Sequence, residues 1–209
     1  VKVAADRFDS RMQTLPRDDF PALPEATGSF NITLARAPLR EMMAKTQFAI
    51  TGEDTRYFLN GALFILRPES MTLVSTDGHR LALITVPREK AEGKKSDTEE
   101  ERVILPRKTL LELGRLLGEG DGDIQYEHGE NHLFFEIGGR LLISRMIDGQ
   151  FPAFERVIPK TNDKRVEFYR DRLTSAVKRV ALLSNERSRA VKFEVSPGKV
   201  EISSNSPEF

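Results

Sequence analysis

The 209-residue sequence contains no cysteine. That absence excludes disulfides, thiolate zinc sites and cysteine nucleophiles together, and it is compatible with a reducing cytoplasm. Long apolar runs are missing as well. None approaches the roughly 20 residues that a membrane-spanning helix needs, so no membrane partner is expected. The chain begins at Val1 rather than at methionine, and we expect it to be a piece of a longer protein.

An excess of either charge is also lacking. Lysine and arginine together number 32 and so do aspartate and glutamate, which makes the formal net charge zero. A DNA-gripping domain is usually basic overall. A DNA-binding function therefore requires the basic residues to gather on one surface while the acidic residues lie elsewhere.

Signatures of catalysis are scarce. The sequence has no glycine-rich phosphate loop and no Ser–His–Asp set with a local signature. His128 and His132 have a zinc-site spacing that needs a helix, but Gly129 between them indicates a hairpin turn. His79 is expected to be a hydrogen-bonding surface histidine. We therefore expect no catalytic residue, no metal and no cofactor. The alternative, a metal-dependent nuclease, needs clustered carboxylates.

Apolar periodicity predicts a unit of one strand, one helix and three strands that occurs twice. The first copy is expected at residues 30–34, 36–47, 56–66, 71–75 and 80–86. The second is expected at residues 102–105, 106–117, 123–127, 133–137 and 140–147. Along residues 37–48 the positions near one face at helical spacing are Leu39, Met42, Met43 and Phe48.

A shift of 71 positions aligns the two copies. Arg36 then matches Arg107, and likewise Leu39 matches Leu110 and Glu41 matches Glu112. One helix and one apolar sheet face cannot bury a core alone, so a pair of units is the natural domain. The predicted fold class is α+β, with repeated strand–helix–three-strand units, two per domain, and helices on one face of antiparallel sheets.

The flanking segments indicate further domains. Residues 1–8 read as one strand, and three prolines (Pro16, Pro21 and Pro24) predict an extended linker. The charged stretch 89–101 predicts a loop, and a third copy begins with a strand at 166–168, a helix at 171–182 and a hairpin at 191–202. We predict a domain tail plus linker, a complete domain and an incomplete domain at residues 1–27, 28–159 and 160–209.

Five segments together resemble the bacterial beta sliding clamps of DNA polymerase III. They match in order and spacing, and they are Thr55–Gly61, Ser75–Ala82, Ile104–Lys108, Asp148–Pro152 and Leu183–Glu186. The resemblance covers nearly the whole chain, from the tail of the first clamp domain to the front of the third. It implies a ring of repeated domains whose helices line the central hole and whose sheets form the outer wall.

The resemblance also implies the function. Such a ring is a processivity factor that encircles double-stranded DNA without sequence preference and does no chemistry, as an accessory subunit of a DNA-directed DNA polymerase. Its expected partners are the replicative polymerase subunit, an ATP-driven clamp loader and other clamp-motif proteins. The full-length protein is expected to be a cytoplasmic, nucleoid-associated homodimer ring, and this piece alone a monomer.

The predicted helices are basic, with nine lysine or arginine residues against three acidic ones. Solvation of exposed helix faces is the plain explanation. With the resemblance, DNA phosphates become the expected partners of residues Arg36, Arg40, Arg56, Tyr57, Arg107, Lys108, Lys178 and Arg179. For Tyr57 a half-buried strand position is the alternative. A protein-binding scaffold that never meets DNA is a further alternative, which charge reversal of Arg107 and Lys108 would distinguish.

The resemblance implies a partner cleft between the second and third domains that takes a short extended peptide with hydrophobic side chains. The matching positions are Leu59, Thr76, Gly78, His79, Arg80, Leu81, Pro152, Arg156 and Val157. Apolar members supply a floor, glycine allows close backbone approach, and the two arginines meet carbonyls or acidic side chains. On pattern alone Leu81 belongs in a strand core and Pro152 in a linker. The end of the third domain, which completes the family's cleft, lies outside this sequence.

Overall fold

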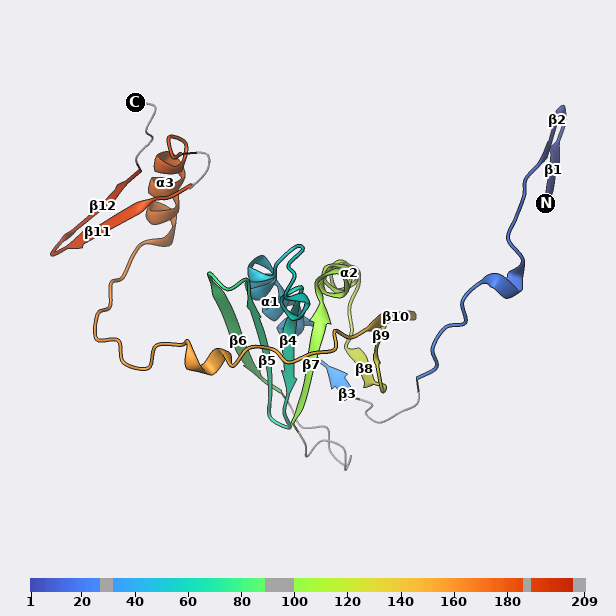
Figure 1. Cartoon of the computed structure of the whole chain (residues 1–209), viewed down its shortest axis with the longest axis horizontal. Helices are drawn as coiled ribbons and strands as arrows, with labels where there is room; N and C mark the ends of the chain where they lie inside the picture. Colours follow the sequence, from blue (N-terminus) through green and yellow to red (C-terminus); the bar gives the residue numbers. More distant parts are fainter. Residues whose placement is uncertain (27–31, 89–99, 186–188, 205–209) are drawn as a thin grey trace. The chain divides into compact units, whose positions relative to one another are not determined.

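The computed structural model describes residues 1–26, 32–88, 100–185 and 189–204 (Figure 1). The chain divides into two compact units, Val1–Phe154 and Glu155–Phe209. None of the helices in these described stretches is long and apolar enough to cross a membrane.

The first unit contains the two copies of the repeat. The first copy comprises β3 (Ile32–Leu34), α1 (Arg36–Thr46), β4 (Gly61–Leu66), β5 (Ser70–Thr76) and β6 (Leu81–Pro87). The second comprises β7 (Glu101–Pro106), α2 (Arg107–Leu117), β8 (Ile124–His128), β9 (His132–Ile137) and β10 (Arg140–Arg145). Both helices have 11 residues, and their first residues are the pair, Arg36 and Arg107, that the 71-position shift aligns.

The two copies exchange their first strands. One antiparallel sheet has the order β6-β5-β4-β7 and the other the order β10-β9-β8-β3, so β7 joins the first copy's sheet and β3 the second copy's. The helices contact each other and lie side by side (Figure 1). Neither copy can close its sheet without the other, which makes the pair one folding domain.

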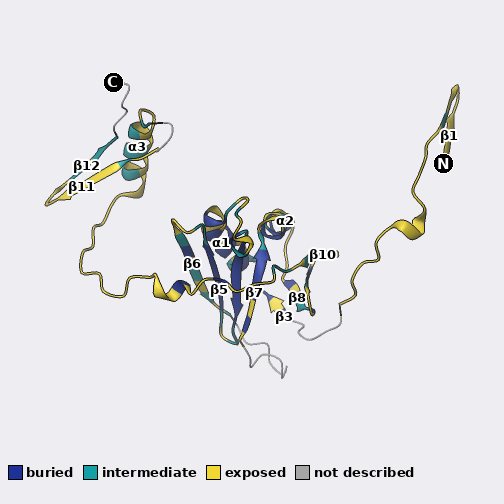
Figure 2. Ribbon diagram, in the orientation of Figure 1, coloured by how far each residue is buried: buried dark blue, intermediate teal, exposed yellow. Residues whose placement is uncertain are grey.

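One core is shared by both sheets and both helices (Figure 2). Alternate residues of β4 face it, and the helices contribute an apolar stripe each. Its largest fully buried members include Phe64, Tyr126, Phe135, Leu39, Met42 and Leu110. Each buried side chain of this size contributes roughly 1.5–3 kcal/mol by leaving water. The expected helix layer on antiparallel sheets is therefore present.

A second apolar cluster covers the opposite face of the β6-β5-β4-β7 sheet. It joins Leu63 and Ile65 of β4 to Phe151 and Phe154, with Leu81 packed against it. The chain segment after β10 thus shields this face, and β4 is buried at all six positions.

Several sequence predictions in the first unit need correction. Residues 1–8 form not one strand but a hairpin of β1 (Lys2–Ala5) and β2 (Phe8–Arg11), with Asp6 at φ 46° in the turn. Aspartate tolerates this left-handed conformation, so no glycine marks the turn. The proline-rich stretch contains one short 3-10 turn, η1 (Arg17–Asp19), directly after Pro16.

The strand predicted at 56–66 starts late. Its first part is the 3-10 turn η3 (Tyr57–Leu59). Asn60 causes the change, because its side-chain oxygen accepts the N–H of Asp54 at 2.9 Å and the hydroxyl of Thr51 at 2.6 Å. These bonds fold the loop onto the start of β4. Most of the predicted loop, 89–99, lies outside the described residues, and Glu101 belongs to β7.

The boundary between the units falls within the one-turn η5 (Phe154–Arg156). The second unit then contains α3 (Arg170–Ala181), β11 (Lys192–Ser196) and β12 (Lys199–Ser203). The hairpin turns at Gly198, whose φ is +71°. No strand forms at 166–168, contrary to the sequence prediction. A lone strand without a hydrogen-bonded neighbour is not stable, and residues 166–168 pair with no described strand.

A buried polar network links the two four-stranded sheets of the first unit. The hydroxyl of Tyr126 in β8 donates to Glu101 Oε1 in β7 at 2.5 Å, and His128 Nδ1 lies 3.1 Å from the same oxygen. Burial, followed by the neighbouring Glu101 charge, raises the pKa of Tyr126 well above its usual value. The phenol is therefore protonated in the folded chain at neutral pH and donates the hydrogen bond that connects β8 to β7.

The raised pKa predicts a loss of stability at alkaline pH. Below about pH 10 the phenol is protonated in both states, whereas above it the unfolded chain ionises first and unfolding is favoured. We expect the urea midpoint to fall from pH 9 to pH 11, and to fall less in Tyr126→Phe. An equally steep fall in this variant would contradict the assignment.

Candidate functional site

Some lysine and arginine side chains of α1 and α2 form ion pairs within the protein, and others do not. Lys45 pairs with Glu41 at 2.5 Å, and Arg115 pairs with Glu112 at 2.6 Å and with Glu119 at 2.5 Å. By contrast, the exposed side chains of Arg40, Arg107 and Lys108 have no hydrogen bond or ion pair with any described residue. Among the described residues of α1 and α2, the cations without a side-chain partner are therefore Arg40 of α1 and the first two residues of α2, Arg107 and Lys108.

Arg36, predicted to face DNA, is engaged inside the protein. An open groove lies between the start of α1 and the end of α2, and Arg36 reaches across it. Its guanidinium donates to the carbonyl oxygens of Leu117 at 2.9 Å and Gly122 at 2.8 Å, with a longer bond to Leu116. The Leu116 and Leu117 carbonyls end α2, and Gly122 lies in the loop that follows it. A cation at the end of a helix also suits the helix dipole.

In the second unit Lys178 and Arg179 of α3 are exposed. Neither makes a side-chain bond to a described residue. Arg172 lies over the ring of Tyr169, with Cζ 5.4 Å from the ring centroid.

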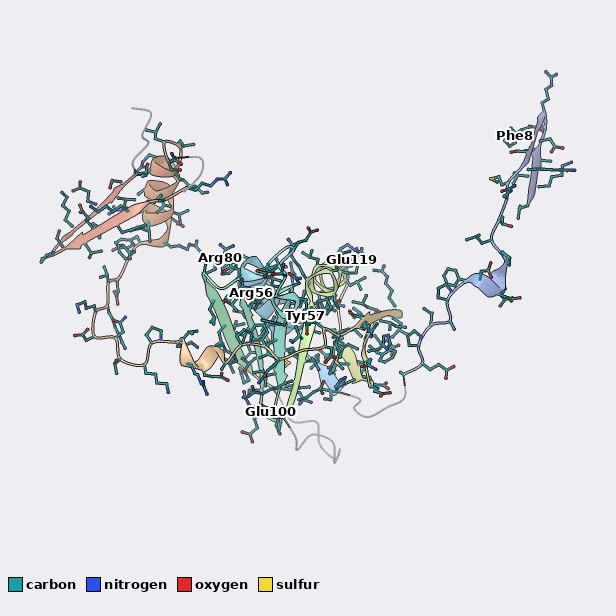
Figure 3. All side chains as sticks on the ribbon, in the orientation of Figure 1. Phe8, Arg56, Tyr57, Arg80, Glu100 and Glu119 are labelled. Carbon is teal, nitrogen blue, oxygen red and sulfur yellow. The ribbon has the colours of Figure 1, made fainter. Side chains whose placement is uncertain are left out.

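Arg56 also has internal partners. Its guanidinium donates to both carboxylate oxygens of Asp54, at 3.0 and 2.7 Å, and to the carbonyl of Asp77 at 3.3 Å. The side-chain hydrogen bond from Arg56, more than any other cause, lowers the pKa of Asp54 to about 2. Figure 3 shows Arg56 beside Arg80, the other arginine that reaches Asp77. Two arginines thus converge on the turn between β5 and β6.

Tyr57 is 57% exposed in η3, so the half-buried strand position is wrong. Its ring lies against the backbone of Gly149, where a Cβ atom would come within 3.2 Å. The φ of Gly149 is +144°. The tyrosine therefore packs on the glycine of the Asp148–Pro152 segment and shows its remaining surface to solvent.

The β5–β6 turn holds the predicted cleft residues in a fixed arrangement. Asp77 Oδ1 accepts the N–H groups of His79 at 3.0 Å and Arg80 at 2.9 Å, and Thr76 Oγ1 donates to the Arg80 carbonyl at 2.8 Å. Gly78 has a φ of +87°, which favours glycine. The N–H of Arg80, first among several donors, lowers the pKa of Asp77.

Arg80 is fastened at two places. Its Nε lies 3.1 Å from Asp77 Oδ2, and its Nη2 donates to the carbonyl of Phe48 at 2.9 Å. Its Cζ is 5.6 Å from the centroid of the Phe48 ring. Phe48 was not singled out as a site residue from the sequence. It lies in the 3-10 turn η2 (Gln47–Ala49) and is 56% exposed.

The remaining cleft residues differ in exposure. Leu81 is half-buried against the second apolar cluster, and exposed Pro152 stands between two members of that cluster, Phe151 and Phe154. Leu59 is only 1% exposed, so it supports the surface from beneath rather than offering surface itself. Arg156 and Val157 are exposed and belong to the second unit. The first unit therefore gathers Thr76, Gly78, His79, Arg80, Leu81 and Pro152.

The described part of the chain groups no three histidine, aspartate or glutamate side chains in a way that could hold a metal ion. His128 and His132 lie on the hairpin strands β8 and β9, and His128 contacts Glu101 instead.

Comparisons with known proteins agree with the geometry. Residues 33–153 match the family described as DNA polymerase III beta subunit, central domain, and residues 155–209 match that subunit's C-terminal domain. The beta sliding clamps of Pseudomonas aeruginosa and Escherichia coli are each 38% identical over 208 residues. Each alignment takes in 100% of this chain and 55% of the relative, so the chain spans about half the length of the curated relatives it matches.

Solved structures are similar over nearly the whole chain. The DNA polymerase III subunit beta from Pseudomonas aeruginosa superposes with a TM-score of 0.89 at 38% identity, covering 99% of this chain and 56% of that one. The sliding clamp from Bacillus subtilis gives 0.85 at 27% identity, covering 99% and 54%. The α+β clamp fold expected from the sequence is confirmed, and this chain belongs to the DNA polymerase III beta subunit family, the bacterial beta sliding clamps.

Proposed function

We propose that this chain is the middle part of a sliding clamp that keeps a replicative polymerase on DNA and does no chemistry itself. Residues 1–27 are then the tail of the first clamp domain plus linker, 28–159 the middle domain and 160–209 the front of the third. The full-length protein forms a homodimeric ring, which an ATP-driven loader opens around double-stranded DNA at the nucleoid. Family membership supports this assignment.

The free cations support the DNA part of the proposal. Arg40, Arg107 and Lys108, with Lys178 and Arg179 of α3, are exposed and have no described side-chain partner. They are the residues we assign to phosphate contact, while Arg36 and Arg56 keep the structural bonds described above. A ring retains DNA by topology, so these contacts need only be weak and salt-sensitive, without base recognition.

The observation that carries the proposal is the β5–β6 turn. It presents Arg80 in a fixed position next to Leu81, whose side chain continues the apolar cluster behind the sheet. An oriented arginine beside an apolar surface suits an extended peptide that has hydrophobic side chains and free carbonyl groups. We therefore assign the surface at the β5–β6 turn to clamp-motif partners, including the polymerase subunit.

Binding of a fluorescein-labelled clamp-motif peptide, followed by anisotropy, tests this assignment. The double substitution Arg80→Ala/Leu81→Ala is expected to weaken binding by about tenfold or more, as loss of a central contact pair does. The matched control Leu141→Ala/Arg145→Ala removes the same residue types from exposed positions of β10 and should leave affinity unchanged. Equal affinity in both variants would exclude the β5–β6 turn as the peptide site.

A further inference from the structure

Phe48 is an exposed aromatic residue whose ring contacts Arg80. The residue is 56% exposed, whereas the next residue, Ala49, is fully buried and anchors the turn. The guanidinium of Arg80 lies over the Phe48 ring and also donates to the Phe48 carbonyl at 2.9 Å. An exposed ring of this kind contributes little to the core, and its face attracts the cation that lies over it.

The arrangement leaves the arginine both oriented and available. Asp77 and the Phe48 carbonyl occupy two N–H groups of Arg80, and its side chain is still 61% exposed. The other N–H groups remain open to an incoming acceptor. A free arginine loses much rotational freedom when it binds, and a side chain held in advance loses less.

We propose that Phe48 is a positioning residue of the partner cleft: its ring holds the Arg80 guanidinium in the plane that meets a peptide carbonyl or carboxylate. The proposal rests on the proposed function, because Arg80 is the cleft residue through which Phe48 acts. Phe48 itself needs no contact with the peptide. The Phe48 ring covers one face of the guanidinium, and Asp77 binds its Nε–H group.

Three variants distinguish the contribution of the Phe48 ring from that of the Phe48 main-chain carbonyl. Phe48→Ala removes the ring and keeps the main-chain acceptor, Phe48→Tyr keeps both, and Leu141→Ala deletes another exposed apolar side chain, at β10, as a matched control. Because all the replaced side chains are more than half exposed, we expect every variant to fold.

The first measurement is the ¹⁵N relaxation of the Arg80 Nε–H group in the chain without peptide. In Phe48→Ala the heteronuclear NOE should fall toward that of a mobile side chain, while Phe48→Tyr and Leu141→Ala keep the original value. This readout is independent of the peptide, so it decides the positioning role even if the chain binds no peptide and the proposed function fails. An unchanged Arg80 signal in Phe48→Ala would overturn the proposal.

The second measurement is the affinity of the labelled clamp-motif peptide. Phe48→Ala is expected to bind about threefold more weakly, as loss of one exposed cation–π contact implies, and Phe48→Tyr as tightly as the original chain. In the background of Arg80→Ala the effect of Phe48→Ala should vanish, because the two act as one unit. A persistent loss in that background would mean direct contact of the ring with the peptide and would overturn positioning.

Discussion

Gly61→Ala is expected to lower the free energy of unfolding of the first unit by about 3 kcal/mol, near the upper end of what overpacking costs. Gly61 is buried at the start of β4, opposite Pro106 of β7. An added Cβ would overlap the main-chain carbonyl of Leu105 and come within 3.0 Å of Ile104 Cγ2 and Ile147 Cδ1. The carbonyl is part of the ladder that joins the exchanged strand β7 to β4, so it cannot move without breaking that pairing.

Urea unfolding followed by circular dichroism measures the change. Gly52→Ala is the control, because Gly52 has a negative φ and nothing within 4 Å of an added Cβ. Its effect should stay within about 0.5 kcal/mol, as for most surface substitutions. If Gly61→Ala lowered the free energy of unfolding no more than Gly52→Ala does, β4 and β7 would not approach each other closely at Gly61.

Apolar periodicity in the sequence predicted the helices and strands of the first unit better than it predicted which strands pair. The 71-position shift aligned the first residues of both helices, Arg36 and Arg107, because each apolar stripe begins at a fixed distance from its start. The strand exchange was not foreseen. A period of two says which face a side chain takes but not which strand lies next to it. The pairing of β3 with β8 depends on contacts 92 residues apart, such as Thr33 with Gln125.

The candidate site shows the same limit. Helical spacing grouped Phe48 with Leu39, Met42 and Met43, but α1 ends at Thr46 and the ring turns outward to Arg80. Sequence spacing could not reveal that change of direction. Similarity of short segments pointed to Arg80 and Leu81, and the hydrogen bonds of the turn supply the physical reason why they are held together.

Arg36 is the clearest case in which charge pattern and geometry differ. In the sequence, Arg36 and Arg40 are both basic residues of the same predicted helix. In the structure, the guanidinium of Arg36 joins the start of α1 to the last carbonyls of α2, 80 and 81 residues away. Arg40 is exposed and has no described side-chain partner. The two residues therefore offer a matched comparison of an arginine with structural bonds and an arginine that we assign to phosphate contact.

Arg36→Ala is expected to lower the free energy of unfolding by about 2 kcal/mol, because charged hydrogen bonds are lost and the partly buried carbonyl of Leu117 loses its side-chain donor. Arg40→Ala should change stability by less than about 0.5 kcal/mol. For the affinity toward a labelled DNA duplex, we expect Arg40→Ala to have the larger effect. Arg40→Ala should reduce the slope of log affinity against log salt by about 0.9, the value for one phosphate contact, and Arg36→Ala should leave the slope unchanged. A stable Arg36→Ala with a reduced salt slope would return Arg36 to the DNA-facing set.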